Sequence, residues 1–320
     1  MSMSTNDLDT VFDDSWGEHH RSGMVAVVGR PNVGKSTLIN RIVGEKIAIV
    51  SPKPQTTRKR QLGIYTTPDA QILFIDTPGL HAPQHKLGEM MVRDAESAFR
   101  DADLILVLLE VSTAPGDAER MMSERIAELH GETPVVLALN KADLLSGDEL
   151  TAYAVANSAL FPFAAKRQLV SAVTGEGVPD LLAQIIELLP LGPRYFPEDQ
   201  LSEASLRFIA AETVREKIML HTEQEIPHSV AVDIESYQER PDGTHYVSAV
   251  IYVERDSQKG IVIGKGGEMI KRIGMEARTE LETMTDARIF LDLRVKVLEN
   301  WRKDEKMMSR LGYRPPKEDE

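Results

Sequence analysis

Between residues 24 and 189, short apolar runs alternate with segments of helical period. The apolar runs, which are typical of buried strands, lie at residues 25–28, 72–75, 104–109, 135–139 and 168–170. The segments with apolar positions three and four residues apart, which are typical of amphipathic helices, lie at residues 35–43, 88–99, 117–130, 149–156 and 178–188. Strands that alternate with helices predict an α/β fold, with a mostly parallel sheet covered by helices on both faces. Ligands of such sheets bind beyond the carboxyl ends of the strands.

The pattern changes at residues 189–199, which carry three prolines and no period. We interpret this stretch as a linker. The elements predicted beyond it are a helix at 203–220, strands at 229–235, 245–254 and 288–297, a glycine-rich loop in a helical setting before the third strand, and a helix at 300–311. This α-β-β-α-β-α order predicts a second domain of the α+β class.

These patterns divide the chain into five segments. We predict a disordered acidic tail, an α/β domain, a linker, an α+β domain and a short charged tail, at residues 1–21, 22–190, 191–201, 202–315 and 316–320.

Composition limits what the two domains can do. The chain has 320 residues, 42% of them apolar, and no cysteine, which excludes disulfides and thiolate metal sites and suits a reducing cytosol. No apolar run reaches the roughly 18 residues of a membrane span, and the acidic N-terminus is unlike a signal peptide, so we expect a cytoplasmic protein. The formal charge of −13 argues against a wholly basic nucleic-acid binder. Any nucleic acid must therefore bind a local basic patch.

Residues 29–36, with the sequence Gly-Arg-Pro-Asn-Val-Gly-Lys-Ser, join the first apolar run to the first helical segment. The pattern GxxxxGK[ST] in this place predicts a phosphate-binding loop. Its glycines let backbone N–H groups turn toward an anion, Lys35 reaches the outer phosphates, and the Ser36 hydroxyl can ligate Mg²⁺. The nucleotide contacts predicted here are Gly29, Asn32, Val33, Gly34, Lys35, Ser36 and Thr37. The site is built for a nucleoside triphosphate.

The sequence Asp-Thr-Pro-Gly follows the second apolar run. At a strand end, the carboxylate of Asp76 can hold Mg²⁺ directly or through water. Gly79 is the residue type for a backbone that must approach the terminal phosphate and move when that phosphate leaves. The alternative is a strand that ends in an Asp-rich turn. The position of the motif after a phosphate loop favours the Mg²⁺ site over this alternative.

The sequence Asn-Lys-Ala-Asp follows the fourth apolar run and indicates which base is bound. The two oxygens of Asp143 can accept from N1–H and the exocyclic amine of guanine, a donor pair that adenine lacks. Lys141 can lay its stem along the ring, and Asn140 can brace the loop. Ser171 and Ala172, after the last short strand, would supply backbone N–H to the guanine oxygen. The base is therefore expected to be guanine.

In this order, the phosphate loop, DTPG, NKAD and SA resemble a translation-factor-class GTPase. Residues 54–58 resemble the first switch of that class, in which a Thr completes the Mg²⁺ shell only when γ-phosphate is present. The resemblance assigns this role to Thr57 by its place before Arg58, with Thr56 as the alternative. It implies the metal ligands Ser36, Thr57 and Asp76 and the catalytic residues Lys35, Thr57 and Gly79.

One departure concerns hydrolysis. In Ras-like GTPases a Gln follows the DxxG glycine and orients the attacking water, whereas this chain has Leu80 there. Because leucine cannot hydrogen-bond water, we expect another group to position it: the Thr57 backbone, a K⁺ ion or a partner. Hydrolysis by the protein alone should be slow and should rest on neutralisation of phosphate charge. His81 and His85 lie nearby, but nothing in the sequence aims either at the γ-phosphate.

A second motif, Gly-Lys-Gly-Gly, lies between two apolar helical stretches at residues 264–267. In a KH fold, a GxxG loop links two short helices and lets a nucleic-acid backbone approach while bases lie in an apolar groove. The side chains expected to line that groove are Ile261, Ile263, Ile270 and Ile273. The α-β-β-α-β order is that of a type II KH domain.

Charge supports this interpretation. Residues 259–278 carry five basic and two acidic side chains, a local net charge of +3. The predicted RNA contacts are Ile261, Ile263, Gly264, Lys265, Gly266, Gly267, Lys271 and Arg272. The alternative is a solvated helix face beside a glycine turn. Further basic residues either extend the patch or pair with local acids: Lys296, Arg302, Lys303 and Lys306.

The chain resembles the Era-like family of bacterial ribosome-assembly GTPases over about residues 22–315. The resemblance rests on the Thr-Thr-Arg of switch one, Leu80 after DTPG and a C-terminal KH domain. The resemblance implies that the protein binds GTP or GDP, Mg²⁺, and the 3′ end of small-subunit ribosomal RNA during maturation of the small ribosomal subunit. It also implies peripheral membrane association, to which the acidity of this chain gives little support. We expect a monomer, although the sequence does not determine the oligomeric state.

The sequence leaves two functions to distinguish. In a GTP-gated switch, GTP orders the loops around Thr57 and Gly79 and changes access to the KH groove. In a binding scaffold, the nucleotide is structural and hydrolysis is incidental. A third interpretation, a GTPase that assists tRNA modification, predicts other domains and no GKGG.

Overall fold

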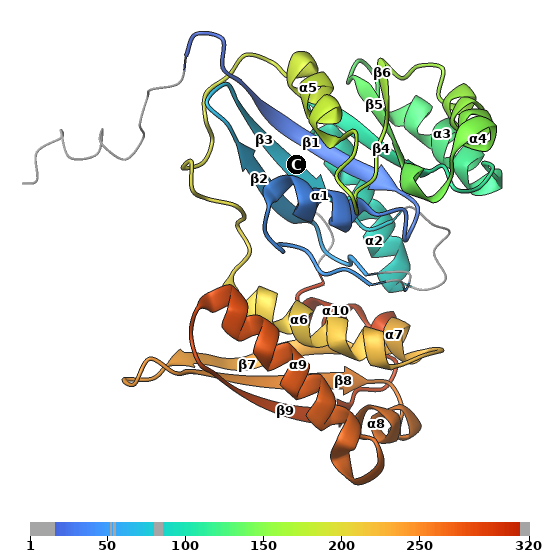
Figure 1. Cartoon of the computed structure of the whole chain (residues 1–320). Coiled ribbons are helices and arrows are strands. Elements are labelled where there is room, and N and C mark those ends of the chain that lie inside the picture. Colours follow the sequence, from blue (N-terminus) through green and yellow to red (C-terminus); the bar gives the residue numbers. More distant parts are fainter. Residues whose placement is uncertain (1–16, 52, 54–55, 80–85, 314–320) are drawn as a thin grey trace, which may run out of the picture. The chain divides into compact units, whose positions relative to one another are not determined.

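The computed structural model of the chain describes residues 17–51, 53, 56–79 and 86–313 (Figure 1). The chain divides into two compact units. Unit 1 consists of Met1–Lys46, Gln61–Thr77 and Ala98–Glu203, and unit 2 consists of Ile47–Arg60, Pro78–Ser97 and Ala204–Glu320. Two segments that precede the linker, residues 47–60 and 78–97, are thus grouped with the C-terminal part of the chain. These are the segments that contain the predicted switches.

Unit 1 contains a six-stranded sheet. Its strands are β1 (Arg21–Gly29), β2 (Gln61–Thr66), β3 (Ala70–Asp76), β4 (Leu104–Glu110), β5 (Val135–Asn140) and β6 (Lys166–Leu169). They lie in the order β2-β3-β1-β4-β5-β6, and every neighbouring pair is parallel except β2 with β3. The mostly parallel sheet is confirmed. The pattern of apolar runs misses β2, because this edge strand mixes Leu62 and Ile64 with glycine and polar residues.

The helices of unit 1 cover this sheet. They are α1 (Lys35–Val43), α3 (Asp117–Leu129), η1 (Ala142–Leu144), α4 (Gly147–Leu160) and α5 (Val178–Leu188), and α2 (Lys86–Arg100) runs from residues of unit 2 into unit 1. Figure 1 shows α1 and α5 on the same face of the sheet. The middle strands are fully buried, as at Val27 and Leu106, because side chains on both of their faces lie under helices.

Unit 2 is built on a three-stranded sheet. Its strands β7 (Ala231–Glu239), β8 (His245–Val253) and β9 (Ile289–Val297) lie in the order β7-β8-β9, with β7 antiparallel and β9 parallel to β8. Its helices are α6 (Leu206–His221), α7 (Ile226–Ser229), α8 (Asp256–Ile263), η2 (Lys265–Gly267), α9 (Glu268–Thr285), η3 (Trp301–Lys303) and α10 (Glu305–Arg310). The α+β class expected for this part of the chain is confirmed.

Alternate residues of β8 pack on opposite faces of this sheet. Ile251 and Val253 belong to a core with Val214 of α6 and Ile273 of α9. In Figure 1, α6 and α9 lie over the sheet. The helices therefore cover one face of the sheet.

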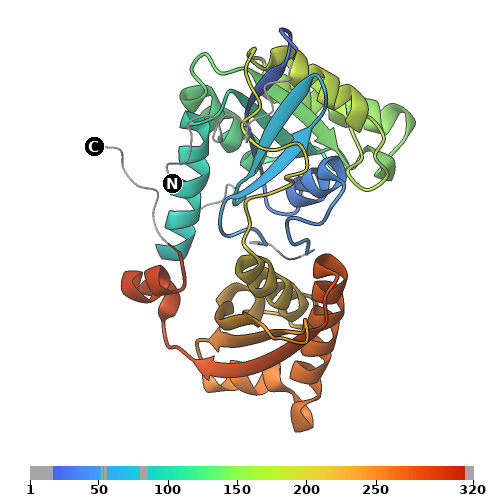
Figure 2. The same cartoon turned by 90° about the vertical axis from the view of Figure 1, so that its left-hand side faces the viewer.

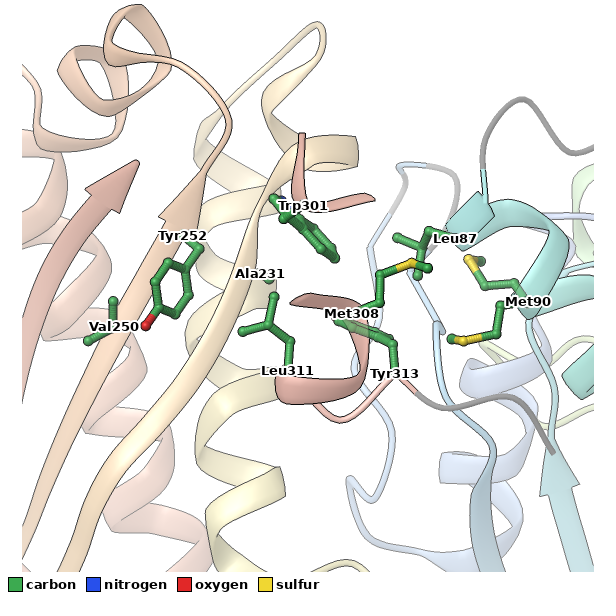
Figure 3. Packing of buried hydrophobic residues seen from close by; sticks show 10 residues of the cluster. Leu87, Met90, Ala231, Val250, Tyr252, Trp301, Met308, Leu311 and Tyr313 are labelled. Atoms are coloured by element: carbon green, nitrogen blue, oxygen red, sulfur yellow. The ribbon is translucent and has the colours of Figure 1, made fainter. Parts of the chain in front are cut away.

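On the other face, Val250 and Tyr252 share a second core with Trp301, Met308 and Leu311. Figure 2 shows α10 well separated from α9. Figure 3 shows Trp301 and Met308 pointing toward Leu87 and Met90 at the start of α2. The segment after β9 thus packs with the start of α2 inside unit 2.

The end of the chain differs from the expected single helix at 300–311. The side chain of Asp304 accepts hydrogen bonds from the backbone N–H groups of Lys306 and Met307. This N-cap starts α10 and separates it from η3. Among the described residues, no helix is both long and apolar enough to cross a membrane.

Candidate functional site

The predicted phosphate loop joins the end of β1 to the start of α1. Gly34 has φ +102°, a left-handed conformation that favours glycine, and a Cβ there would lie 2.4 Å from Asn140 Nδ2. Asn32 also has a positive φ of 66°. The sequence pattern thus supplies glycine where the backbone turns at the N-terminus of α1, the end at which a helix favours anions.

Lys35 lies inside this loop with only 6% of its surface exposed. Its ammonium donates to the carbonyl oxygens of Gly29 and Arg30, each at 3.0 Å. Burial lowers the pKa of Lys35 to about 8, and the nearby charge of Asp76 opposes this effect. The ammonium is therefore held in place beside the turn, where it would meet a phosphate.

Ser36 and Asp76 come together at the carboxyl edge of the sheet. The Ser36 hydroxyl donates to Asp76 Oδ2 at 2.7 Å, and Asp76 lies opposite Val27 in the β1–β3 register. Thr77 donates to the Val27 carbonyl at 2.7 Å and fixes the chain just after Asp76. A hydroxyl and a carboxylate are the oxygen ligands that Mg²⁺ prefers.

Among the described residues, no group of three or more His, Cys, Asp or Glu side chains could hold a metal ion. Mg²⁺ commonly uses one or two carboxylates and completes its shell with phosphate oxygens and water. Ser36 and Asp76 are the residues of unit 1 that would hold it.

Asn140 connects three sequence motifs. Its Nδ2 donates to the Val33 carbonyl in the phosphate loop at 2.7 Å, and its Oδ1 accepts from the Ala172 backbone N–H at 2.9 Å. The side chain is 2% exposed. Asn140 therefore braces the loop, as the sequence suggests, and it fixes the position of residue 172 as well.

Lys141 has a left-handed φ of 64° and places its ammonium 2.7 Å from Glu110 Oε2. Glu110 ends β4 and also accepts from the Ser112 hydroxyl at 2.5 Å. Its pKa is lowered, because burial acts to raise it but bonds from Lys141 and Ser112 outweigh that effect. Glu110 was not among the predicted site residues, although it stands at a strand end like Asp76 and Asn140.

Asp143 lies in η1 and is exposed, in keeping with a group that faces a ligand. The backbone N–H groups of Ser171 and Ala172 already donate to Glu176 and Asn140, respectively. A guanine oxygen would have to share one of these donors. The role of residues 171–172 stays a prediction.

Two predicted site residues, Thr57 and Gly79, belong to unit 2, whereas Ser36 and Asp76 belong to unit 1. Both are buried, and their roles at the nucleotide stay predictions. Pro54, Gln55, Leu80, His81 and His85 lie outside the described residues, so nothing is added to their interpretation.

Arg58 ties the first switch segment to other elements of unit 2. It is 1% exposed and donates to three carbonyl oxygens at the end of α7. The bonds reach Val230 at 2.6 Å, Pro227 at 2.8 Å and His228 at 3.0 Å. The pKa of Arg58 is lowered, and burial is the largest of the several causes. The carbonyls lie at a helix C-terminus, where a cation is favoured.

Arg215 of α6 makes a second connection. It is fully buried, pairs with Glu212, and donates to the Thr56 carbonyl. Thr56 therefore takes part in contacts within unit 2 through its backbone. The sequence marked Arg58 only as the last residue of the Thr-Thr-Arg of switch one, with no role of its own, and offered no signal for Arg215, which stands in no recognisable motif.

The GKGG loop turns sharply between α8 and α9. Gly264 has φ +74°, and a Cβ there would lie 2.7 Å from the Cβ of Met269. Lys265 is exposed on the turn. The loop is therefore open to a ligand backbone, and glycine at position 264 is required by both conformation and space.

The side chains around the loop divide into two groups. Ile261 is 53% exposed and Ile263 is partly exposed, as a groove requires. Ile273 is fully buried in the core with Val214, so its assignment to the groove is wrong. Residues three apart on a helix lie on the same face. Ile270 and Ile273 therefore share a face of α9, and this face packs on the core of unit 2.

The basic patch is only partly neutralised. Arg272 pairs with Glu276 at 3.0 Å, whereas Lys265 and Lys271 are exposed and make no ion pair within the described ranges. Lys296 and Arg302 pair with Glu235 and Glu254, so these two follow the alternative of local pairing.

Two family models match the chain. One is described as a 50S ribosome-binding GTPase and matches residues 24–141, and the other is described as a KH domain and matches residues 225–302. GTPase Era of Geotalea daltonii is 48% identical over 298 residues, which cover 92% of this chain and 99% of that protein. GTPase Era of Thermotoga maritima is 46% identical over 297 residues, with 92% and 98% covered.

Two solved structures are similar over the same extent. One is Era in complex with MgGDPNP and nucleotides 1506–1542 of 16S ribosomal RNA, with a TM-score of 0.87, 36% identity, and 92% of this chain and 99% of that chain covered. The other is a variant of Aquifex aeolicus Era bound to GDP·AlF₄⁻, with the same TM-score, identity and coverage.

Proposed function

This chain belongs to the Era family of GTPases, and we propose that it is a GTP-gated switch that binds the 3′ end of small-subunit ribosomal RNA and assists small-subunit assembly. It is a GTPase with a P-loop domain and a KH domain. The RNA that it binds, the gating and the residues that carry each step are our proposals.

At the nucleotide, the Lys35 ammonium and the backbone N–H groups of Gly29 and residues 32–37 bind the phosphates. Ser36 and Asp76 hold Mg²⁺, and Thr57 completes its shell in the GTP state. Bound there, Mg²⁺ neutralises charge on the β- and γ-phosphates. Asp143 selects guanine. The 2.7 Å bond between Ser36 and Asp76 supports this arrangement, because it brings two Mg²⁺ ligands to the phosphate loop.

For RNA, the GKGG loop admits the backbone and the side chains of Ile261 and Ile263 contact bases. Lys265 and Lys271 supply charge for the phosphates. The open turn at Gly264 and the exposure of both lysines support this role.

The observation that carries the gating is the bonding of Arg58 to the Pro227, His228 and Val230 carbonyls. Arg58 follows Thr57, the residue expected to respond to γ-phosphate. A change of backbone at Thr57 would disturb these bonds in the unit that contains the KH loop. Affinity for GTP and affinity for RNA would thereby be linked.

The test compares RNA affinity in the GDPNP, GDP and nucleotide-free states. The probe is an RNA of nucleotides 1506–1542 of 16S ribosomal RNA, the segment bound by the similar structure. Coupling of the usual size predicts affinities about 5-fold or more apart. Equal affinities in all three states would reject the switch and favour the scaffold.

Hydrolysis provides an independent test. We expect slow turnover by the protein alone and stimulation by small ribosomal subunits, because Leu80 leaves the attacking water to another group. If K⁺ supplies that group, turnover in KCl should exceed turnover in NaCl at equal ionic strength. No stimulation by subunits would again favour the scaffold.

We also propose that the protein is a cytoplasmic monomer. Sedimentation at micromolar concentration tests the monomer. Cell fractionation with a membrane-protein marker separates a cytoplasmic location from peripheral association with the cell membrane.

A further inference from the structure

An exposed aromatic stack lies at one end of the sheet in unit 2. Phe290, at the start of β9, is 53% exposed, whereas its neighbour Ile289 is buried. Tyr246 lies directly opposite Phe290 in the β8–β9 register, with ring centres 5.8 Å apart and an angle of 23° between the rings. The Arg240 guanidinium lies 5.0 Å from the Tyr246 ring centre and 5.5 Å from that of Phe290. These contacts hold Phe290 in place while much of its surface stays open.

A hollow of ≈ 650 Å³ adjoins Phe290. Its lining comes from the turn before β8, the end of α9 and the start of β9, namely Thr244, Arg278, Glu282, Asp286, Ala287, Arg288, Ile289 and Phe290. Arg278 and Arg288 are exposed, and within the part of the chain that the structure describes their guanidinium groups make no ion pair or hydrogen bond.

The acids near these arginines are engaged differently. Glu282 accepts from the Ile289 backbone N–H at 3.0 Å, and the neighbouring Glu280 pairs with Lys217. Asp286, at the C-cap of α9, is the second carboxylate of the hollow, so two carboxylates and two guanidinium groups share its lining. Within the part of the chain that the structure describes, neither carboxylate is paired with either guanidinium group, so both arginines can meet a ligand beside an open aromatic ring.

We propose that Phe290, Tyr246, Arg240, Arg278 and Arg288, which we call the aromatic platform, form a second RNA site. A single-stranded base stacks on Phe290, and its phosphates approach Arg278 and Arg288. Bases of any identity stack on aromatic side chains, and arginine binds phosphate oxygens in a bidentate way. The proposal rests on RNA binding by unit 2, the function proposed above.

The aromatic platform is distinct from the GKGG loop. The loop precedes the first residue of α9, and the hollow contains the C-cap of the same 18-residue helix. At 1.5 Å per residue the helix spans about 27 Å. RNA held at the loop must therefore continue for about eight nucleotides, at ~3.4 Å each, to reach Phe290. The platform would contact the sequence that flanks the segment at the loop.

The experiment measures binding of the full-length protein to the RNA of nucleotides 1506–1542 by fluorescence anisotropy in the presence of GDPNP. Phe290→Ala should weaken binding about 5- to 10-fold, the lower part of the range for loss of one stacked base. Phe290→Tyr keeps a stacking face and should stay within about 2-fold of wild type. An Ala variant within that limit, or a Tyr variant as weak as the Ala variant, would overturn the proposal.

Charge gives a second measurement that does not depend on the aromatic substitution. Arg288→Ala should lower the slope of log affinity against log salt by about 0.7, one single-strand phosphate contact. Arg294→Ala is the matched control, because Arg294 lies on β9, six residues after Arg288, but pairs with Glu235. Asp286→Asn keeps a residue type that tolerates the left-handed backbone and should tighten binding. Equal slopes for Arg288→Ala and Arg294→Ala would overturn the phosphate contact.

Lys265→Ala separates this proposal from the function on which it rests. Lys265 belongs to the GKGG loop, so its loss should weaken binding whether or not the platform acts. If Lys265→Ala weakens binding and Phe290→Ala does not, RNA binding by the loop stands and the platform is rejected. If the wild-type protein does not bind this RNA at all, the proposed function itself is rejected.

Discussion

At the scale of single residues, Asp143 should decide which nucleotide is bound. Its carboxylate is exposed after β5, and two acceptor oxygens match the two donors of guanine. We expect Asp143→Asn to weaken GTP binding about 100-fold, since hydrogen bonds to a charged group contribute roughly 1.5–3 kcal/mol.

The same substitution should improve binding of xanthosine triphosphate, because the asparagine amide offers a donor to the added oxygen. Competition of both nucleotides against a fluorescent guanine nucleotide measures the change. An unchanged preference for guanine would contradict the assignment of Asp143.

Lys35 should make nucleotide binding depend on pH. Its pKa of about 8 in the free protein means that the ammonium loses its proton in mildly alkaline solution. Phosphate binding requires the charged form, so affinity should fall up to about tenfold per pH unit above pH 8. Titrations of a fluorescent GTP analogue between pH 7 and 9.5 test this.

Lys35→Arg is the matched control for the pH effect. Its guanidinium stays charged over this range, so its affinity should change less with pH even if it starts weaker. Parallel pH profiles for both proteins would show that another group titrates. For folding alone the sign is opposite: a lowered lysine pKa means that stability rises as pH increases from about 8 toward 10.5.

At the scale of elements, Trp301 anchors the segment after β9 to the outer face of the sheet in unit 2. It is fully buried, and its Nε1 donates to the Ser229 carbonyl at 2.8 Å. Trp301→Ala should lower the free energy of unfolding by about 3–5 kcal/mol, because it leaves both a cavity and a buried carbonyl. Urea unfolding followed by circular dichroism measures this loss.

Phe290→Ala serves as the comparison, because Phe290 is a large aromatic residue of the same unit but is half-exposed. Phe290→Ala should lower the free energy of unfolding by much less than Trp301→Ala does. Equal losses would mean either that Trp301 contributes little or that Phe290 is structural.

Elements with a long apolar run could be predicted from the sequence, whereas elements without one could not. The central strands β1, β3, β4 and β5 carry apolar runs that any buried parallel strand needs. The edge strand β2 and the four-residue helix α7 have no such run. Tertiary contacts stabilise both, and a local pattern does not contain them.

At the scale of the whole molecule, Arg58 should carry the link between nucleotide and RNA. Arg58→Gln removes the charge and leaves the two N–H donors of an amide in place of the five of the guanidinium, which holds three carbonyls at the end of α7. We expect the RNA affinities measured with GDPNP and with GDP to become equal within about 2-fold, whereas an intact link typically gives a factor of about 5 or more. GTP hydrolysis should continue.

Arg60→Gln is the control, because Arg60 lies two residues away and pairs with Asp94 at the surface. It should keep the difference between the two nucleotide states. By reciprocity, RNA should tighten GDPNP binding by the factor by which GDPNP tightens RNA binding, and should do so only where Arg58 is intact. If the Arg58→Gln protein still binds RNA with different affinities in the two nucleotide states, the link does not run through Arg58.

The order of elements and the chemistry at their ends can be predicted from the sequence alone. The phosphate loop at 29–36, Asp76 and the Asn-Lys-Ala-Asp at 140–143 each begin directly after an apolar run, so a run and its motif fit within a short stretch of chain. Such features are local, so period and residue type are enough to identify them.

Which distant groups meet depends on the tertiary structure. Asn140 bonds Val33 across 107 residues, and Arg58 bonds the Val230 carbonyl across 172. The burial of Ile273 and the open face of Phe290 likewise depend on which helix or strand lies next to each. The physical reason is that hydrogen bonds and burial depend on distance in space, which no periodicity along the chain records.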